Sequence, residues 1–298
     1  MSGAMERAIK KEATSIPEAA MQASDQSIGE ILVAQGVLTS TDVAEVVAYA
    51  EAENMPFGDA AVSTNKIRQE DLDQALAHQY RFPYVKPGKG SLSKELVAAY
   101  KPFSKQADMF RSIRAELMLG IFQTDQKVLS IVSPTKKDGR SYLTANLAVA
   151  FAQLGKRTCI VDCHLQKARQ HELFRLVEAP GVSALLSGRN VAETKALQVS
   201  DVANLSVIQA GPCPPNPDEL IAGEGFGRLI AAARREYDIV LVDTPPGDSS
   251  TAVDWIAARC ANVLIVYRRD VTSIADAREF ADRMRARATV VGTILNTN

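Results

Sequence analysis

Residues 133–141, SPTKKDGRS, combine glycine, a basic residue and a hydroxyl in the order of a phosphate-binding loop. Such a loop, G-x-x-x-x-G-K-[ST], surrounds phosphate oxygens with backbone N–H groups and adds a lysine charge. Arg140 stands here in place of the lysine, and arginine can bind phosphate oxygens bidentately. We predict a nucleotide phosphate site with a catalytic role for Arg140. Its contacts comprise Thr135, Lys136, Lys137, Asp138, Gly139, Arg140, Ser141 and Tyr142, and Ser141 also binds a metal.

Two aspartates follow apolar runs further along the chain. Asp162 ends TCIVD, residues 158–162, and Asp243 ends DIVLVD, residues 238–243. A carboxylate at a strand end can hold Mg²⁺ or its water in phosphoryl-transfer sites, or it can cap the next helix. Because both aspartates accompany the glycine-containing loop, we predict that Asp162 and Asp243 are metal-binding residues.

The elements that must position these residues are strands alternating with helices. Apolar runs over 128–133, 158–162, 238–243, 262–267 and 290–295 predict strands, with helical segments between them. Near-continuous apolar strands indicate an α/β fold, in which helices cover both faces of a parallel sheet. Ligands of such sheets bind at the carboxyl ends of the strands, where the loop and both aspartates fall.

Composition is ordinary for a soluble globular chain of 298 residues, with 46% hydrophobic and 23% charged residues. The net charge of −1 gives no field that would favour nucleic acid as a partner. We expect no signal peptide or spanning segment, and a cytoplasmic protein in which any membrane role comes through a partner. The cysteines match no common metal site and are interpreted as buried or incidental thiols: Cys159, Cys163, Cys213 and Cys260.

The N-terminal part contains an internal repeat. Residues 1–26 lack an apolar period and are predicted to be disordered. The stretch from Ser27 then aligns with the stretch from Pro56 at an offset of 29 residues, and each copy predicts a short helix, a turn and a second helix. We therefore predict a helical module over 27–86, a linker over 87–103 and a second domain over 104–298.

The helical module resembles the N-terminal domain of type II secretion and pilus assembly ATPases, some of which bind cyclic di-GMP through paired R-L-G-x-x-L-x-x-x-G motifs. In this chain Ser27 replaces the arginine of the first copy, and Asn65 replaces the later glycine of the second. Only the second copy keeps a terminal glutamine, Gln79. A protein-docking module is the favoured interpretation, and a cyclic di-GMP site is the disfavoured one.

Residues 104–298 resemble the bacterial tyrosine kinases, through the loop, IVDCHLQKARQHELF, GPCPPNPDEL, YDIVLVDTPPG and GTILN. With the module, the chain resembles the EpsG-type chain-length-determinant kinases of exopolysaccharide clusters. The resemblance implies a P-loop fold of the MinD/ParA type, ATP and Mg²⁺, and a membrane polysaccharide co-polymerase as partner. It further implies that Asp162 is the catalytic aspartate, that Asp243 holds Mg²⁺ and that Asn296 contacts adenine. Three residues would form either a self-association motif or a solvated charged face: Asp108, Arg111 and Arg114.

Several positions depart from the family pattern. The family's D-x-D-L-R-x-P has His164, Gln166 and Ala168 here, and Ala252 stands where a further aspartate is usual, with Asp254 two residues on. Losing one preorganised contact typically costs about 10²–10³ in rate. An active kinase and a nucleotide-binding scaffold therefore both stay open. A positioning ATPase is disfavoured, because Thr135 replaces the signature lysine of that class.

The tyrosines limit the substrates that an active kinase could have. The sequence ends at Asn298 without the tyrosine run of many relatives, so we expect no tail autophosphorylation. We expect the acceptor to be another protein, or an internal residue such as Tyr142.

Overall fold

A computed structural model describes residues 26–86, 90–189 and 195–297. The chain divides into two compact units, residues 1–83 and 84–298. The segment predicted to be disordered, 1–26, lies outside the described residues apart from Gln26. Among the helices of the described ranges, none has both the length and the apolar character needed to cross a bilayer.

The first unit consists of two helix pairs that follow the repeat. The first pair is α3 (Ile28–Ala34) and α4 (Ser40–Ala52), and the second is α5 (Phe57–Ser63) and α6 (Gln69–Gln79). Gly36 and Asn65 occupy equivalent turns with φ of 70° and 55°. Asparagine tolerates this left-handed conformation better than most side chains, which explains its replacement of glycine. The pairs share one apolar core that includes Ile31, Leu32, Val46, Ala60 and Leu72.

Two residues at positions of the cyclic di-GMP pattern, Ser27, which departs from it, and Gln79, which keeps it, have structural partners within this unit. The Ser27 hydroxyl accepts a hydrogen bond of 3.3 Å from Glu30 N and caps α3. The Gln79 side chain donates to the Gln26 carbonyl at 3.1 Å. These contacts give both residues a role in helix capping and packing. That the module docks a protein, rather than cyclic di-GMP, stays a prediction.

The second unit is built on a seven-stranded sheet in the order β3-β4-β2-β5-β1-β6-β7. Neighbouring strands pair in parallel, except that β3 is antiparallel to β4. The five predicted strands are confirmed as β1 (Val128–Val132), β2 (Thr158–Asp162), β5 (Ile239–Asp243), β6 (Asn262–Arg268) and β7 (Thr289–Asn296). The sequence analysis missed β3 (Leu197–Gln198) and β4 (Leu205–Ile208), two short strands at one edge.

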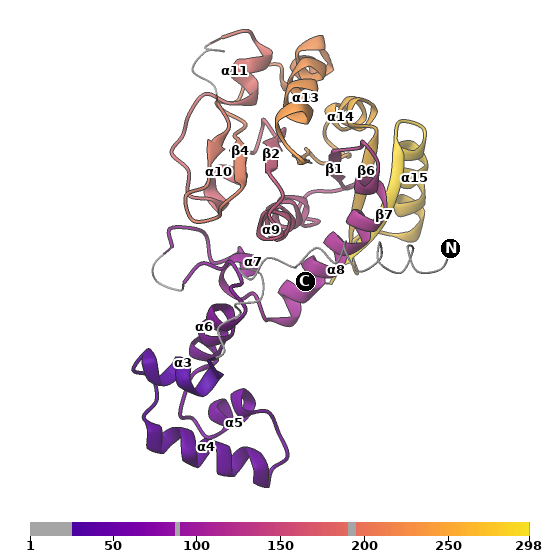
Figure 1. Ribbon diagram of the computed structural model, residues 1–298. Coiled ribbons are helices and arrows are strands. Elements are labelled where there is room, and N and C mark those ends of the chain that lie inside the picture. Colours follow the sequence, from indigo (N-terminus) through magenta and orange to yellow (C-terminus); the bar gives the residue numbers. More distant parts are fainter. Residues whose placement is uncertain (1–25, 87–89, 190–194, 298) are drawn as a thin grey trace, which may run out of the picture. The chain divides into compact units, whose positions relative to one another are not determined.

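Helices cover both faces of this sheet, as the apolar runs predict (Figure 1). One face packs under α9 (Arg140–Gln153), with α7 (Val97–Tyr100) and α8 (Lys105–Leu119) beyond it. The opposite face is covered by α13 (Glu224–Glu236), α14 (Ala252–Cys260) and α15 (Ile274–Arg285). Side chains of β1 alternate between the two layers of helices. Leu129 and Ile131 face α9, whereas Val128 and Val132 face the opposite layer. The remaining helices are η1 (Ile121–Gln123), α10 (Gln170–Leu173), α11 (Val182–Leu186) and α12 (Pro217–Ala222).

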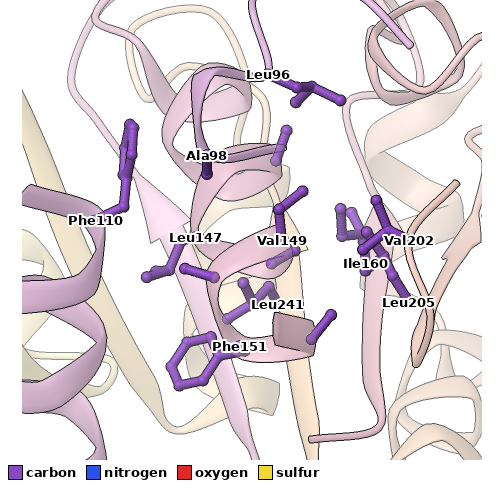
Figure 2. Close-up of a cluster of buried hydrophobic side chains, with 14 of the residues drawn as sticks. Leu96, Ala98, Phe110, Leu147, Val149, Phe151, Ile160, Val202, Leu205 and Leu241 are labelled. Atoms are coloured by element: carbon purple, nitrogen blue, oxygen red, sulfur yellow. The ribbon is translucent and has the colours of Figure 1, made fainter. Parts of the chain in front are cut away.

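The stretch predicted as a linker, 87–103, differs from that expectation, because its described part packs into the second unit. Asn146 of α9 accepts from Ala98 N at 3.0 Å and donates to the Glu95 carbonyl at 3.1 Å. Figure 2 shows Leu96 and Ala98 in the same buried cluster as side chains of α9. The boundary between the units therefore falls after Pro83, and residues 91–100 form a strap over α9.

Candidate nucleotide site

The predicted phosphate loop runs from the end of β1 to the first turn of α9. Lys137 and Gly139 both have left-handed backbone, with φ of 63° and 106°. A side chain at Gly139 would also meet Asn296, since an added Cβ would lie 2.6 Å from Asn296 Nδ2. The N–H groups at the start of α9 lack intrahelical partners and favour an anion there. The loop therefore has the backbone form and the helix end that phosphate binding requires.

Asp138 fixes the shape of this loop from inside. Its carboxylate is buried and accepts from Thr135 N and Thr135 Oγ1, each at 2.8 Å. Asn296 donates to the Asp138 carbonyl at 2.9 Å, which places the last strand against the loop. Lys136 and Lys137 are exposed, so their charges face solvent at its rim. The adenine contact of Asn296 stays a prediction.

Arg140 lies beneath the loop, with its side chain buried. Its Nε donates to the Thr244 carbonyl at 3.0 Å and Nη1 donates to the Thr135 carbonyl at 2.7 Å, with a further bond to Ser133 Oγ. Burial lowers the pKa of the guanidinium, and the carboxylates of Asp243, Asp138 and Asp248 oppose that shift. Arg140 thus links the ends of β1 and β5, and its contact with phosphate stays a prediction.

Asp162 and Asp243 are register partners at the ends of the neighbouring strands β2 and β5. Both side chains are buried. Burial and the neighbouring Asp243 carboxylate raise the pKa of Asp162 to about 8, and burial also raises the pKa of Asp243. The sheet therefore brings together the two carboxylates that the sequence places far apart.

Each carboxylate has a specific set of donors. Asp162 accepts backbone N–H bonds from His164 at 3.2 Å, Arg169 at 3.2 Å and Gln170 at 3.0 Å. Asp243 accepts from the Gln170 side chain at 2.7 Å and from the Ser141 side chain, which lowers its pKa against the effect of burial. Asp162 thus caps the start of α10, the alternative to metal binding that the sequence left open. It also lies beside the Asp243 carboxylate.

The site contains oxygens suited to a hard cation. Asp243 Oδ1 and Gln170 Oε1 are buried without a hydrogen-bond partner. Magnesium prefers carboxylate and carbonyl oxygens and keeps several of its waters. With the Ser141 hydroxyl alongside, these oxygens fit Mg²⁺, so Ser141 and Asp243 would hold the ion and Asp162 would lie next to it.

His164 changes the charge at the position of the family's second acid. Burial, followed by the positive charges of Arg140, Lys167 and Lys136, lowers the pKa of its imidazole to about 4. His164 is therefore neutral near physiological pH. Gln166, at the position of the family's arginine, is exposed and brings no positive charge.

Asp254 has another partner and does not supply the missing acid. Its carboxylate accepts from Arg283 Nε at 3.0 Å and also pairs with Arg287. This places Asp254 in an ion-pair cluster between α14 and α15.

Two residues with contacts in this region were not predicted from the sequence. Gln170 contacts Asp162 and Asp243; it lies within IVDCHLQKARQHELF, but no local pattern in that stretch assigns this glutamine a role. Asp218, within PPNPDEL, accepts from Thr251 N at 2.7 Å and Ser250 Oγ at 2.9 Å, and so caps the start of α14. The distinctive PPNPDEL segment could have indicated such a role, since it begins a helix with proline and acids.

The predicted self-association residues on α8 have partners inside the unit. Asp108 and Arg111 form an i, i+3 ion pair. Arg114 is partly buried and donates to the Ala150 carbonyl of α9 at 2.8 Å. The triplet is therefore not a fully solvated charged face, and its role in self-association stays a prediction.

Comparison with known proteins identifies relatives of the second unit. A family model described as ATPase MipZ matches residues 130–276. The putative tyrosine-protein kinase CapB of Staphylococcus aureus is 32% identical over 209 residues, which cover 70% of this chain and 91% of CapB. The tyrosine-protein kinase Wzc of Salmonella typhi is 31% identical over 214 residues, which cover 72% of this chain and 30% of Wzc.

Solved structures share the arrangement of the sheet and helices. The chimerical protein CapA2B2 is 29% identical, with a TM-score of 0.63, and the match covers 75% of this chain and 98% of that one. The chain thus spans nearly all of CapB but less than a third of Wzc. The loop, the paired aspartates, and the identity to CapB over most of its length place the chain in the bacterial tyrosine-protein kinase family.

Proposed function

We propose that the chain is an ATP-dependent tyrosine-kinase-type regulator of exopolysaccharide chain length and export. The observation that carries the proposal is the pairing of Asp162 with Asp243 beside Ser141, at the carboxyl edge of the sheet. Two buried carboxylates at this edge have an unfavourable electrostatic interaction in the absence of a cation or a proton. A bound Mg²⁺ and a transferable proton would offset the repulsion between the two carboxylates.

The residues of the loop and of the strand ends have different roles in the proposed reaction. Backbone N–H groups of residues 135–141 bind the phosphates, and Ser141 and Asp243 hold the metal. When bound, Mg²⁺ neutralises charge that develops on the β- and γ-phosphates. Asp162 accepts the proton of the attacking tyrosine hydroxyl. Burial and the Asp243 carboxylate raise the pKa of Asp162, which strengthens its carboxylate as a proton acceptor.

The family and the first unit support a proposal for the acceptor and the site of action. A polysaccharide co-polymerase of the inner membrane presents the tyrosines, and the protein is peripheral at that membrane through this partner. The helical repeat of residues 27–86 serves as the docking module for the assembly. Its separate apolar core supports a function independent of the nucleotide site.

A second candidate function is a nucleotide-holding scaffold in the same assembly. His164 is neutral where the family has an acid, and Arg140 is held by three acceptors of the protein itself. Both features weaken phosphoryl transfer more than nucleotide binding, because backbone amides and Asp243 suffice to bind.

One experiment separates the kinase from the scaffold. Binding of ATP·Mg²⁺ is measured by calorimetry, and phosphotyrosine is measured after incubation with the co-polymerase, for the wild type, Asp162→Ala and Asp238→Ala. Asp238 is a matched control, because it lies at the opposite end of β5 and pairs with Arg157 at 2.9 Å. A kinase forms phosphotyrosine in the wild type and the control but not in Asp162→Ala. ATP binding without any Asp162-dependent transfer would leave only the scaffold.

A further inference from the structure

Gln170 contacts three groups of the nucleotide site, although it belongs to no recognised motif of the loop or the strand ends. Its backbone N donates to Asp162 Oδ2 at 3.0 Å. Its side-chain Nε2 donates to Asp243 Oδ2 at 2.7 Å and to the Ser141 carbonyl at 3.1 Å. The side chain is fully buried, so α10 begins with a residue fixed between both carboxylates and the phosphate loop.

The other oxygen of this amide is left without a partner. Gln170 Oε1 and Asp243 Oδ1 are both buried, and neither accepts a hydrogen bond. The two atoms belong to side chains that already touch each other through Gln170 Nε2 and Asp243 Oδ2. Buried acceptors normally have partners, and two unsatisfied ones at a predicted metal site point to a ligand that brings donors.

We propose that Gln170 is a positioning residue of the metal site. Its Nε2 donates to both the Asp243 carboxylate and the Ser141 carbonyl and so fixes the carboxylate in place. Its Oε1 would accept a hydrogen bond from a water of the Mg²⁺ shell. Magnesium retains most of its waters in proteins, and groups that bind those waters orient the ion. This inference rests on the proposed function, because it requires Mg²⁺ at Ser141 and Asp243.

The departure at His164 increases the importance of this amide. An acid at that position would bring a carboxylate to this part of the site, and the histidine that replaces it does not. Gln170 supplies a neutral oxygen from the start of α10, and the Nε2 bonds to Asp243 and Ser141 fix where its amide group lies. A merely structural role, in which Gln170 anchors α10 to α9, predicts no dependence on metal.

The test measures metal and nucleotide binding separately. Mn²⁺ binding to the ADP-bound protein is followed by electron paramagnetic resonance, and ADP binding in excess EDTA is followed by calorimetry. Gln170→Met removes the polar atoms at similar length. Gln209→Met is the matched control, since Gln209 is also buried and donates to the Val177 carbonyl at 2.8 Å outside the site.

We expect Gln170→Met to weaken Mn²⁺ binding by about 10- to 100-fold, as outer-shell substitutions do, with little change in metal-free ADP affinity. Unchanged Mn²⁺ affinity, or an equal loss of ADP affinity in EDTA, overturns the inference. If Gln170→Met fails to fold, Gln170→Asn keeps both amide atoms on a shorter side chain and must weaken Mn²⁺ binding without an equal loss of ADP affinity in EDTA. A wild type that does not bind Mn²⁺·ADP would instead contradict the proposed function itself.

Discussion

Asp162 and Asp243 stand directly opposite each other, because β2 and β5 pair in parallel and end in the same register. Each strand is otherwise apolar and buried, so the fold brings two carboxylates into an environment that disfavours their charge. Asp162 accepts hydrogen bonds from backbone N–H groups, and Asp243 accepts one from the Gln170 side-chain amide. These bonds only partly offset the cost of burial. The topology of the sheet therefore places two buried carboxylates side by side, as the proposed cation site requires.

Restoring the family's second motif should increase phosphoryl transfer. His164→Asp combined with Gln166→Arg returns an acid beside the metal and an arginine two residues on. We expect the rate of phosphotyrosine formation to rise by about 10²-fold, the scale of one preorganised electrostatic contact. Phosphoblotting against the co-polymerase measures it, and a double variant no faster than the wild type would show that these positions do not limit transfer.

His164 should make the protein sensitive to acid. Its pKa is lowered from 6.5 in an unfolded chain to about 4 in the fold, so the unfolded state binds more protons between these values. The contribution of this group to the free energy of unfolding therefore falls as pH falls from about 6.5 to about 4. Urea unfolding at several pH values should give a shallower acid loss for His164→Asn than for the wild type, whereas His171→Asn serves as the control. Equal slopes for His164→Asn and the wild type would argue against this account.

Removing the Arg140 side chain should affect both the loop and the nucleotide. Arg140→Ala leaves the Thr135 and Thr244 carbonyls without this donor and takes a positive charge from the phosphate site. We expect the free energy of unfolding to fall by about 1–3 kcal/mol, the cost of buried groups left unsatisfied. ATP affinity, measured by calorimetry, should fall with it. Unaltered ATP binding would mean that the arginine is structural only.

The position of the strap, residues 91–100, should depend on one asparagine of α9, Asn146. Asn146→Ala removes the acceptor of Ala98 N and the donor to the Glu95 carbonyl. The expected loss in unfolding free energy is about 1–3 kcal/mol, because a buried N–H is left unpaired. Limited proteolysis should then cleave the strap faster than in the wild type. Identical unfolding and cleavage would mean that the strap is held by its apolar contacts alone.

The site residues that sequence could predict are those with local signals. Apolar runs ending in aspartate predicted β2 and β5, and the glycine beside Arg140 predicted the start of α9. Gln170 was missed because its contact with Asp243 joins residues 73 positions apart, and no local pattern encodes it. The strap was taken for a linker for a similar reason: glycine and proline lie just before it, at positions 87, 88 and 90, and its contacts with Asn146 join residues about fifty positions apart. The strand β4 is short and contains a serine, so its apolar period was too weak to predict it.

The most direct test of the paired-carboxylate site is the Mg²⁺ dependence of ATP affinity. Calorimetry with and without Mg²⁺ compares the wild type, Asp243→Ala and the control Asp238→Ala. We predict that Mg²⁺ tightens ATP binding to the wild type and the control by at least about tenfold, and that Asp243→Ala loses this gain, as metal sites do when a ligand is removed. Equal ATP affinity with and without Mg²⁺ in the wild type, or an unchanged gain in Asp243→Ala, would contradict the account.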